Sequence, residues 1–235
     1  MTSISLSDIM NKRNKNSFFE SSHTNILKKI LLKISYIPFN IRVMWYKVWN
    51  KYILFINDIR FGKNLIIINK IYIKKHATAQ IEIGDNFTFS NDDAINPLSR
   101  NLRGCIFADE NSTIKFGNNV GISSACIWAK ENIEIGNNVL IGGDCIIMDT
   151  DAHNLDYKIR AAKAVDERGR NIDKISAKSS PIKIEDNVLI GTRCIILKGV
   201  TIGARSIIGS GSVVTKSIPS DCIAAGNPCK AIKSI

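Results

Sequence analysis

The chain has 235 residues, of which 45% are hydrophobic and 23% are charged, so it can bury a sizeable core and is not disordered throughout. Its 32 Lys and Arg residues against 21 Asp and Glu residues give a formal net charge of +11, which commonly indicates an acidic partner. Residues 1–60 hold ten of the basic and three of the acidic side chains, a balance of +7, so the rest of the chain is only mildly basic and a nucleic-acid-binding fold is disfavoured.

The six cysteines are expected to be reduced thiols. Residues 1–22 are polar and lack the apolar core of a cleavable signal peptide. No two cysteines stand in a C-x-x-C spacing, and the three histidines, His23, His76 and His153, lie far apart in the sequence. The pattern therefore predicts neither a disulfide framework nor a metal site.

Residues 26–56 are expected to be helical, because a cation separates their apolar groups every three to six residues. Pro38 is expected to end or kink the first helix, and a second helix is expected over residues 41–55. In the first helix the apolar residues share one side and the cations lean to the other: Ile26, Leu27, Ile30, Leu31 and Ile34 against Lys28, Lys29 and Lys33.

No stretch of this region approaches the roughly 18 uninterrupted apolar residues that a membrane-spanning helix needs. Two interpretations of the helices remain open. In the first, they form a cap that covers an exposed end of the following domain or packs against a neighbouring subunit. In the second, they lie in the interface of an anionic membrane, where the lysines meet the lipid and four aromatic residues sit at headgroup depth: Trp45, Tyr46, Trp49 and Tyr52.

From Phe61 onwards the informative feature is a period of six residues. Residues 135–147 and 184–196 superpose after a shift of 49, and looser copies occur at residues 83–89 and 116–122, the latter continued by Trp128. At least four coils of about 18 residues can be assembled from three such units each. The aliphatic residues that carry the period are Ile135, Ile141 and Ile147, and then Ile184, Ile190, Ile196, Ile202, Ile208 and Val214.

Each unit begins with an aliphatic residue, often continues with Gly and then has Asn or Asp, which suits a short strand followed by a tight corner. Three units close a triangular coil, and coils stacked about 4.8 Å apart form inward aliphatic ladders. The sequence therefore predicts a mainly β protein, a parallel β-helix over residues 61–235. Two positions before each ladder residue lies a slot for a small inward residue, where Cys126, Cys145 and Cys194 are expected to be structural.

The next ladder position after Ile147 is His153, where the repeat stops. Residues 154–183 are expected to leave the helix as a long inserted loop, and loops of this length in a compact domain are commonly functional. His153 is either a polar residue that marks the departure of the loop or a general base, with Asp149 and Asp151 near enough to orient or charge it. Spacing alone does not decide between the two.

Two motifs near the end of the chain are specific: Ile208-Gly-Ser-Gly-Ser-Val-Val-Thr-Lys-Ser-Ile-Pro219 and Ala224-Ala-Gly-Asn-Pro-Cys-Lys230, after Ile-Gly hexapeptides at residues 190, 202 and 208. They resemble the hexapeptide-repeat acetyltransferases, in the group that contains maltose and galactoside O-acetyltransferases and polysaccharide-modifying relatives. The resemblance covers roughly residues 80–235. It implies a left-handed parallel β-helix, acetyl-CoA as the cosubstrate, no metal, and a homotrimer with active sites between neighbouring subunits.

The resemblance also implies roles for single residues. His153 matches the histidine that acts as base on the acceptor hydroxyl, although it lies one residue further from the preceding ladder position than in the sugar acetyltransferases. The backbone N–H of Thr192, beside Gly191, matches the donor to the tetrahedral oxyanion. Acetyl-CoA is expected along the coils at Gly209 and Ser210, which match the pantetheine-binding positions, at Thr215, and at Lys230 and Lys233 near the nucleotide phosphates.

Two departures from the family concern the acceptor. Ser123 stands where the sugar acetyltransferases have an acceptor-binding asparagine, and Leu189 replaces a tryptophan, so the acceptor is expected to differ from maltose and galactoside. Residues 154–182 of the inserted loop hold seven cations, which either favour a nucleotide-linked, phosphorylated or acidic glycan or form a merely solvated face. They are Lys158, Arg160, Lys163, Arg168, Arg170, Lys174 and Lys178.

The helical, basic region 1–60, which ends in Arg60-Phe-Gly-Lys-Asn64, is similar to the start of relatives that decorate capsule, O-antigen or exopolysaccharide units. We therefore expect a cytoplasmic O-acetyltransferase for a hydroxyl of a surface-polysaccharide precursor, drawn by region 1–60 to the inner face of the bacterial membrane. The alternatives are a xenobiotic or antibiotic O-acetyltransferase, a serine acetyltransferase, and a non-catalytic β-helix scaffold or glycan-binding protein.

Overall fold

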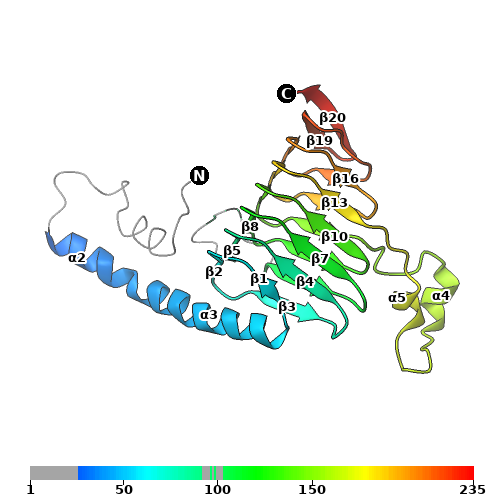
Figure 1. Ribbon diagram of the computed structural model, residues 1–235, viewed down its shortest axis with the longest axis horizontal. Coiled ribbons are helices and arrows are strands. Elements are labelled where there is room, and N and C mark those ends of the chain that lie inside the picture. Colours follow the sequence, from blue (N-terminus) through cyan, green and yellow to red (C-terminus); the bar gives the residue numbers. More distant parts are fainter. Residues whose placement is uncertain (1–25, 92–95, 97, 99–102) are drawn as a thin grey trace.

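The computed structural model describes residues 26–91, 96, 98 and 103–235 (Figure 1). Three sheets of short strands form the walls of a coil that rises along one axis, and the two N-terminal helices extend from its lower end. The expectations for residues 1–22, for His23 and for the side chains of Leu27 and Lys29 fall outside the described residues.

Consecutive strands visit the three sheets in turn, apart from the last two, which both belong to the second sheet. Sheet 1 contains β1 (Arg60–Phe61), β4 (Gln80–Ile83), β7 (Thr113–Phe116), β10 (Asn132–Ile135), β13 (Ile182–Ile184) and β16 (Thr201–Ile202). Sheet 2 contains β2 (Ile66–Ile68), β5 (Thr88–Ser90), β8 (Gly121–Ser123), β11 (Leu140–Ile141), β14 (Leu189–Ile190), β17 (Ile207–Ile208), β19 (Cys222–Gly226) and β20 (Cys229–Ser234). Sheet 3 contains β3 (Tyr72–Lys75), β6 (Cys105–Ala108), β9 (Cys126–Ala129), β12 (Ile146–Met148), β15 (Ile195–Ile196) and β18 (Val213–Val214).

Each strand pairs in parallel with the strands one coil below and above it, except that β20 folds back antiparallel on β19. The fold is the expected left-handed parallel β-helix. The predicted ladder is confirmed, because the six aliphatic residues from Ile184 to Val214 are all fully buried. The small inward slot holds Cys145 and Cys194, also fully buried, whose thiols donate to carbonyl oxygens of the next coil.

The predicted corner asparagines are also confirmed. Asn64, Asn86, Asn119, Asn138 and Asn187 all have φ between 56° and 61°, the left-handed region that asparagine tolerates better than most residues. Their side chains bond to one another from coil to coil at 2.8–3.0 Å. The sequence thus places asparagine where it both relieves backbone strain and ties the coils together.

Cys126 is where the predicted register is wrong. The side of the coil from Ile122 to the next inward residue is one residue short, so Ile127 rather than Trp128 is fully buried. Ala125 therefore fills the small inward slot, and Cys126 faces outward in register with Cys105 on β6. All six cysteines are free thiols.

The N-terminal region forms α2 (Ile26–Ser35) and α3 (Ile37–Ile56). The first helix ends before Pro38 as predicted, but the second begins four residues earlier than expected, because proline suits the first turn of a helix. α3 packs on β2 through the buried residues Val43, Asn50 and Leu54. The Asn50 side chain donates to the Asn69 carbonyl at 2.8 Å and accepts from the Ile71 N–H at 3.2 Å.

The predicted insertion leaves the coil between β12 and β13 and projects from its side (Figure 1). It contains two short helices that the aperiodic sequence of the loop does not indicate, α4 (Tyr157–Ala162) and α5 (Ile172–Ile175). An antiparallel bridge between Thr150 and Ser179 closes the base of the loop.

Candidate functional site

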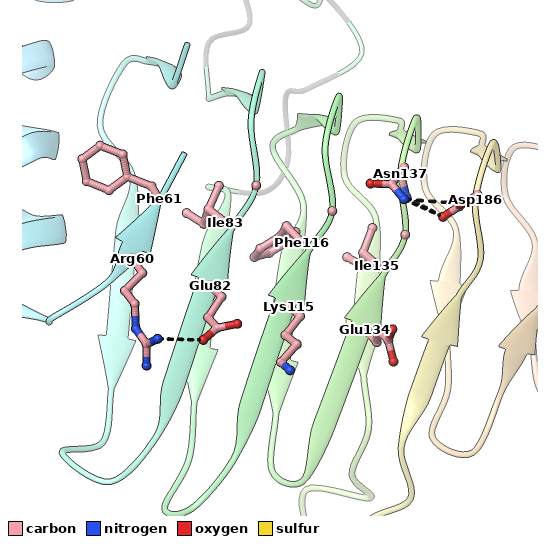
Figure 2. A pocket seen from close by; sticks show the side chains of 13 residues that line it. Arg60, Phe61, Glu82, Ile83, Lys115, Phe116, Glu134, Ile135, Asn137 and Asp186 are labelled. Carbon is pink, nitrogen blue, oxygen red and sulfur yellow. Dashed lines mark hydrogen bonds and ion pairs between the residues drawn. The ribbon is translucent and has the colours of Figure 1, made fainter. Parts of the chain in front are cut away.

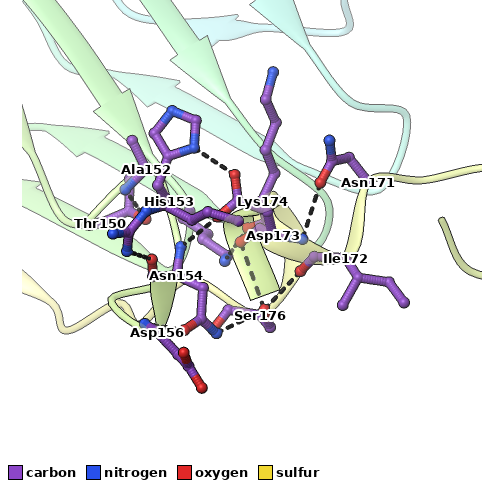
Figure 3. Close-up of polar contacts among 12 residues, drawn as sticks. Thr150, Ala152, His153, Asn154, Asp156, Asn171, Ile172, Asp173, Lys174 and Ser176 are labelled. Carbon is purple, nitrogen blue, oxygen red and sulfur yellow. Dashed lines mark hydrogen bonds and ion pairs between the residues drawn. The ribbon is translucent and has the colours of Figure 1, made fainter. Parts of the chain in front are cut away.

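His153 lies at the base of the inserted loop and meets a carboxylate there (Figure 3). Its Nδ1 lies 2.5 Å from Oδ2 of Asp173, while 58% of the His153 side chain is exposed. An ionised carboxylate can only accept, so Nδ1 carries the proton of the neutral ring and the Nε2 lone pair is available to another group. The tautomer required of a general base is thus set by Asp173.

Asp173 is held in place by α5 and by the chain beside His153. The Asn171 side chain caps α5 by accepting from the Asp173 N–H at 2.9 Å. The other carboxylate oxygen of Asp173 accepts from the Asn154 N–H at 2.8 Å. The hydrogen bond from His153 is the main reason that the pKa of Asp173 lies below its ordinary value, so the carboxylate stays ionised in weak acid.

Lys130 ties the C-terminal end of α5 to the coil. Its Nζ donates to the carbonyl oxygens of Lys174, Ile175 and Ala177 at 2.8, 3.0 and 2.6 Å. Carbonyls at a helix end have no partner within the helix, and a lysine is a suitable donor to them. Lys130 therefore positions the helix that carries Asp173.

The prediction that Asp149 and Asp151 orient His153 is wrong. The fully buried Asp149 instead accepts from three backbone N–H groups, of Lys130, Glu131 and Asn132, at 2.6–2.8 Å. Asp151 pairs with Lys198 at 3.0 Å. The carboxylate that orients His153 is Asp173, twenty residues further along, where the loop returns to its base. Nothing in the sequence close to His153 indicates this partner.

The inserted loop and the outer faces of β3, β6 and β9 enclose a hollow of about 1060 Å³. The coil contributes Lys74, Phe107 and Trp128 to its lining. The loop contributes Ala152, next to His153, and residues 171–176 with the exception of Asp173. The hollow thus adjoins the His153–Asp173 pair.

The residues that the sequence assigns to acetyl-CoA lie mainly along the edge between sheets 2 and 3. A Cβ added to Gly142 would lie 2.6 Å from the Thr192 nitrogen, and one added to Gly191 would lie 2.6 Å from the Ser210 nitrogen, so these corners stack closely. The N–H groups of Thr192 and Ser210 have no hydrogen-bond acceptor among the described residues. Ser123 lies on the same edge, because its neighbour Ile122 pairs with Ile141.

The other predicted acetyl-CoA residues are more scattered. Gly209 stacks on Ala225, which pairs with the exposed Lys230, so Lys230 lies at the upper end of this edge. Lys233 lies further back on β20, opposite Ile223. Thr215 follows β18 and therefore lies at the opposite edge of sheet 3. The structure brings Gly191, Thr192, Gly209, Ser210 and Lys230 to one edge and leaves Thr215 and Lys233 away from it.

His153 and Thr192 lie at opposite edges of sheet 3 within one chain. The Thr192 hydroxyl donates to the Gly143 carbonyl at 2.6 Å, before β12, whereas His153 follows β12. Gly143 and Asp149 are six residue steps apart with β12 between them, a span of roughly 20 Å in extended conformation. A single chain therefore does not bring the predicted base and the predicted oxyanion donor together.

A second hollow, of about 560 Å³, lies on the outer face of sheet 1 (Figure 2). Arg60, Glu82, Lys115 and Glu134 stand in register on successive strands, so each charge neighbours an opposite one. Arg60 and Glu82 form an ion pair at 3.5 Å. The lining holds no histidine, serine or cysteine, and its lysine and glutamates stand beside opposite charges on the neighbouring strands. This surface is a compensated charge ladder rather than a second candidate site.

Some of the loop cations that could attract an anionic acceptor already bind groups of the protein itself. Arg170 pairs with Asp166 and with Glu110, and Arg160 donates to the Asn154 carbonyl. The part of the chain that the structure describes also holds no group of three or more His, Cys, Asp or Glu side chains that could hold a metal ion.

Comparisons with known proteins identify the same six-residue repeats. Residues 181–216 match the family model of the bacterial transferase hexapeptide (six repeats). A Schizosaccharomyces pombe protein with a provisional acetyltransferase name is 45% identical over 103 residues, which are 44% of each chain. The galactoside O-acetyltransferase of Escherichia coli is 39% identical over 103 residues, again 44% of each chain. The chain thus spans about half the length of the curated relatives it matches.

Among solved structures, AntD, an N-acyltransferase from Bacillus cereus in complex with dTDP and 3-hydroxybutyryl-CoA, has a TM-score of 0.54. The match covers 79% of this chain and 87% of that chain, at 18% sequence identity. At that identity the likeness supports the β-helical fold and carries nothing about substrates.

Proposed function

We propose that this chain, which carries the repeats of the bacterial transferase hexapeptide family, is an acetyl-CoA-dependent O-acetyltransferase that modifies a sugar hydroxyl with His153 as general base. The observation that carries the proposal is the His153–Asp173 pair, an exposed imidazole whose proton-accepting nitrogen is selected by a buried carboxylate. Hydroxyl groups are poor nucleophiles until a positioned base removes their proton.

The reaction needs few groups. His153 Nε2 takes the proton of the acceptor hydroxyl as its oxygen attacks the thioester carbonyl carbon. The oxyanion of the tetrahedral intermediate accepts from the Thr192 N–H, which has no acceptor among the described residues. Collapse of the intermediate breaks the carbon–sulfur bond, and the imidazolium returns its proton to the leaving thiolate. The products are an acetyl ester and free coenzyme A.

The donor would lie along the edge between sheets 2 and 3. The Ser210 N–H, one coil above Thr192, is a second donor without an acceptor in the described part of the chain, and it suits a pantetheine amide. Lys230 at the upper end of the edge supplies a positive charge for a phosphate. Thr215 and Lys233 lie away from this edge, so their position gives less support for contact with acetyl-CoA.

We propose a homotrimer with active sites between subunits, and the same geometry supports it. Because His153 and Thr192 occupy opposite edges of sheet 3, the base of one copy must face the donor edge of another for both to reach one acetyl group. A closed threefold arrangement supplies three equivalent clefts of this kind. Ser123, on the donor edge, would then face the acceptor bound beside the neighbour's histidine.

We propose that the acceptor is a surface-polysaccharide precursor handled in the cytoplasm at the inner face of the bacterial membrane. The support is the N-terminal region: exposed apolar side chains recur every three or four residues along α2 and α3, at Ile30, Ile34, Ile37, Ile41, Met44 and Val48. Residues 26–56 contain cations and no acidic residue, so an anionic lipid surface fits them better than a second copy of the same helices. No helix of the described chain is long and apolar enough to span a bilayer.

The activity test compares the wild type with His153→Ala and with a control, Tyr157→Ala, an exposed loop residue. Each protein is incubated with acetyl-CoA and a panel of sugar acceptors, and the gain of about 42 mass units and the released coenzyme A are measured. The expected loss for His153→Ala is about 10²–10⁴-fold in kcat, with acetyl-CoA binding unchanged by calorimetry. Undiminished transfer by His153→Ala overturns the assignment of the base, and a wild type that binds no acetyl-CoA overturns the activity.

Membrane contact is tested separately by flotation with vesicles of phosphatidylglycerol or of phosphatidylcholine. Binding only to the anionic vesicles, lost in the Lys47→Glu/Lys51→Glu variant, is the expected result. Equal recovery of the wild type and this variant with the anionic vesicles would contradict the proposal.

A further inference from the structure

Aromatic side chains form one wall of the hollow between the inserted loop and the lower coils. Lys74, Phe107 and Trp128 stand in register on β3, β6 and β9, on the outer face of sheet 3, and all three line the hollow. The rings of Phe107 and Trp128 meet edge to face, with centroids 5.5 Å apart, and the Lys74 ammonium lies 4.9 Å from the Phe107 centroid. Aromatic rings at such positions present apolar surface that the folded core does not use.

The Trp128 ring is fixed by a polar contact at its edge. Its Nε1 donates to Oδ2 of Asp109 at 3.0 Å, a residue that also lines the hollow. A ring held in this way binds a ligand with little loss of side-chain freedom. The second oxygen of the Asp109 carboxylate can accept from a ligand hydroxyl, since a carboxylate has about four acceptor positions.

The charges of the hollow are compensated by one another. Arg170 binds Asp166 at 2.8 Å between Nε and Oδ2 and also pairs with Glu110, and Lys130 is engaged by the carbonyls at the end of α5. The hydrogen bond to the Asp166 carboxylate raises the pKa of Arg170 further above its ordinary value. The backbone N–H of Arg170 is the main reason that the pKa of Asp166 lies below its ordinary value. The lining thus offers hydrogen bonds without a strong excess of either charge.

We infer that this hollow binds an uncharged hexopyranose oligosaccharide, with one sugar ring packed against Trp128 and its hydroxyls on Asp109 and neighbouring polar groups; the inference rests on the proposed acetyl transfer and names its acceptor class. A pyranose ring combines an apolar C–H face with a polar rim, which matches an aromatic wall flanked by carboxylates. The volume of about 1060 Å³ is at the upper end of small-molecule sites, so it accommodates more than one ring.

The position of the hollow fits an acceptor site. Ala152 lines it and is covalently next to His153, and Ile172 and Lys174, on either side of Asp173 in the sequence, line it as well. A bound oligosaccharide can therefore extend from Trp128 along α5 and present a hydroxyl beside His153. Trp128 becomes a specificity-determining residue that fixes which sugar of the chain is modified.

The test begins with binding alone. The wild type is applied, without acetyl-CoA, to a printed array of neutral and acidic oligosaccharides of two to six sugars, and the strongest neutral binder is titrated by calorimetry. In Trp45→Phe/Trp49→Phe, Trp128 is the sole remaining tryptophan, so a ligand-dependent change of its fluorescence locates the sugar. Trp128→Ala is expected to weaken binding at least tenfold and Trp128→Phe, which keeps a ring, by much less.

The kinetic readout separates this inference from the activity itself. Trp128→Ala should raise KM for the oligosaccharide and leave KM for acetyl-CoA and the oligomeric state unchanged. Sugar binding at Trp128 without acetyl transfer would refute the proposed activity and leave the site standing. The inference is overturned if Trp128→Ala transfers acetyl with an unchanged acceptor KM or changes its oligomeric state. It is also overturned if the wild type binds only acidic sugars or no sugar at all.

Discussion

Asp173 and His153 stand twenty positions apart in the sequence, and their side chains meet at 2.5 Å between Oδ2 and Nδ1. The inserted loop makes this contact by returning to its own base, where Asn154 also bonds to the backbone of Asp173 at 3.1 Å. A loop that interrupts the repeat thus supplies the group that orients the imidazole. The loop is part of the candidate catalytic apparatus rather than only a lid over it.

Replacing Asp173 by Asn should reduce kcat about 10²-fold, because an amide can bind Nδ1 in either tautomer and no longer stabilises the imidazolium. Acetyl-CoA affinity should be unchanged, since Asp173 acts on the reaction through His153 and is not among the residues assigned to the donor. Steady-state kinetics and calorimetry on the same preparation measure both. Asp156→Asn is the matched control: Asp156 caps α4 in the same loop, and asparagine caps equally well. Equal activity of Asp173→Asn and Asp156→Asn would contradict the orienting role.

The stability of the folded chain should also depend on Asp173 in a pH-dependent way. Its pKa is lower in the folded than in the unfolded chain, chiefly because of the hydrogen bond from His153, so folding favours the ionised form. This stabilisation is complete above the ordinary Asp pKa of about 3.9 and is lost as the pH falls through the lower folded value. The urea midpoint of the wild type should exceed that of Asp173→Asn at pH 6, and the gap should narrow below about pH 4. A gap that widens in acid would refute this linkage.

Lys130 should control the order of the loop. Lys130→Met keeps much of the side-chain volume but removes the donors to three carbonyls at the end of α5. We expect faster tryptic cleavage within residues 154–183 and a loss of about tenfold in kcat, equivalent to about 1.4 kcal/mol of activation free energy. Lys178→Met serves as control, because Lys178 is an exposed lysine of the same loop and its loss also removes one tryptic site. Identical cleavage rates for the two variants would argue against Lys130 as an anchor.

The coil could be predicted from the sequence because each turn repeats the same physical problem. A buried aliphatic residue every six positions and an asparagine at a corner with positive φ are local requirements, visible without knowledge of the rest of the chain. The prediction failed at Cys126 and Trp128 for a related reason: one side of that coil has five residues instead of six, and a fixed period carried past Ile122 assigns the wrong face.

The site was only partly predictable. His153 could be predicted because it interrupts an aliphatic ladder. Thr192 and Ser210 could be predicted because they match positions of the family that the sequence resembles. Asp173 was not visible, since its role depends on how an aperiodic loop folds back, and the nearer acids serve other partners: Asp149 binds backbone N–H groups and Asp151 pairs with Lys198. Proximity in sequence is a poor guide to proximity in space once the chain has left the repeat.

The corrected register of Cys126 leads to a direct chemical test. Cys105 and Cys126 face outward on neighbouring strands with their sulfur atoms 3.2 Å apart, and this contact lowers the pKa of Cys105 to about 7, which favours its reactive thiolate. In-register strands lie about 4.8 Å apart, within the Cα range of disulfides. Diamide should therefore oxidise this pair, two thiols giving one disulfide, while the buried Cys145 and Cys194 remain reduced, as peptide mass mapping of the folded protein would show. Cys126→Ser should abolish the disulfide. If Cys126 were as resistant to oxidation as the buried Cys145, it would face inward, and the structure would be contradicted.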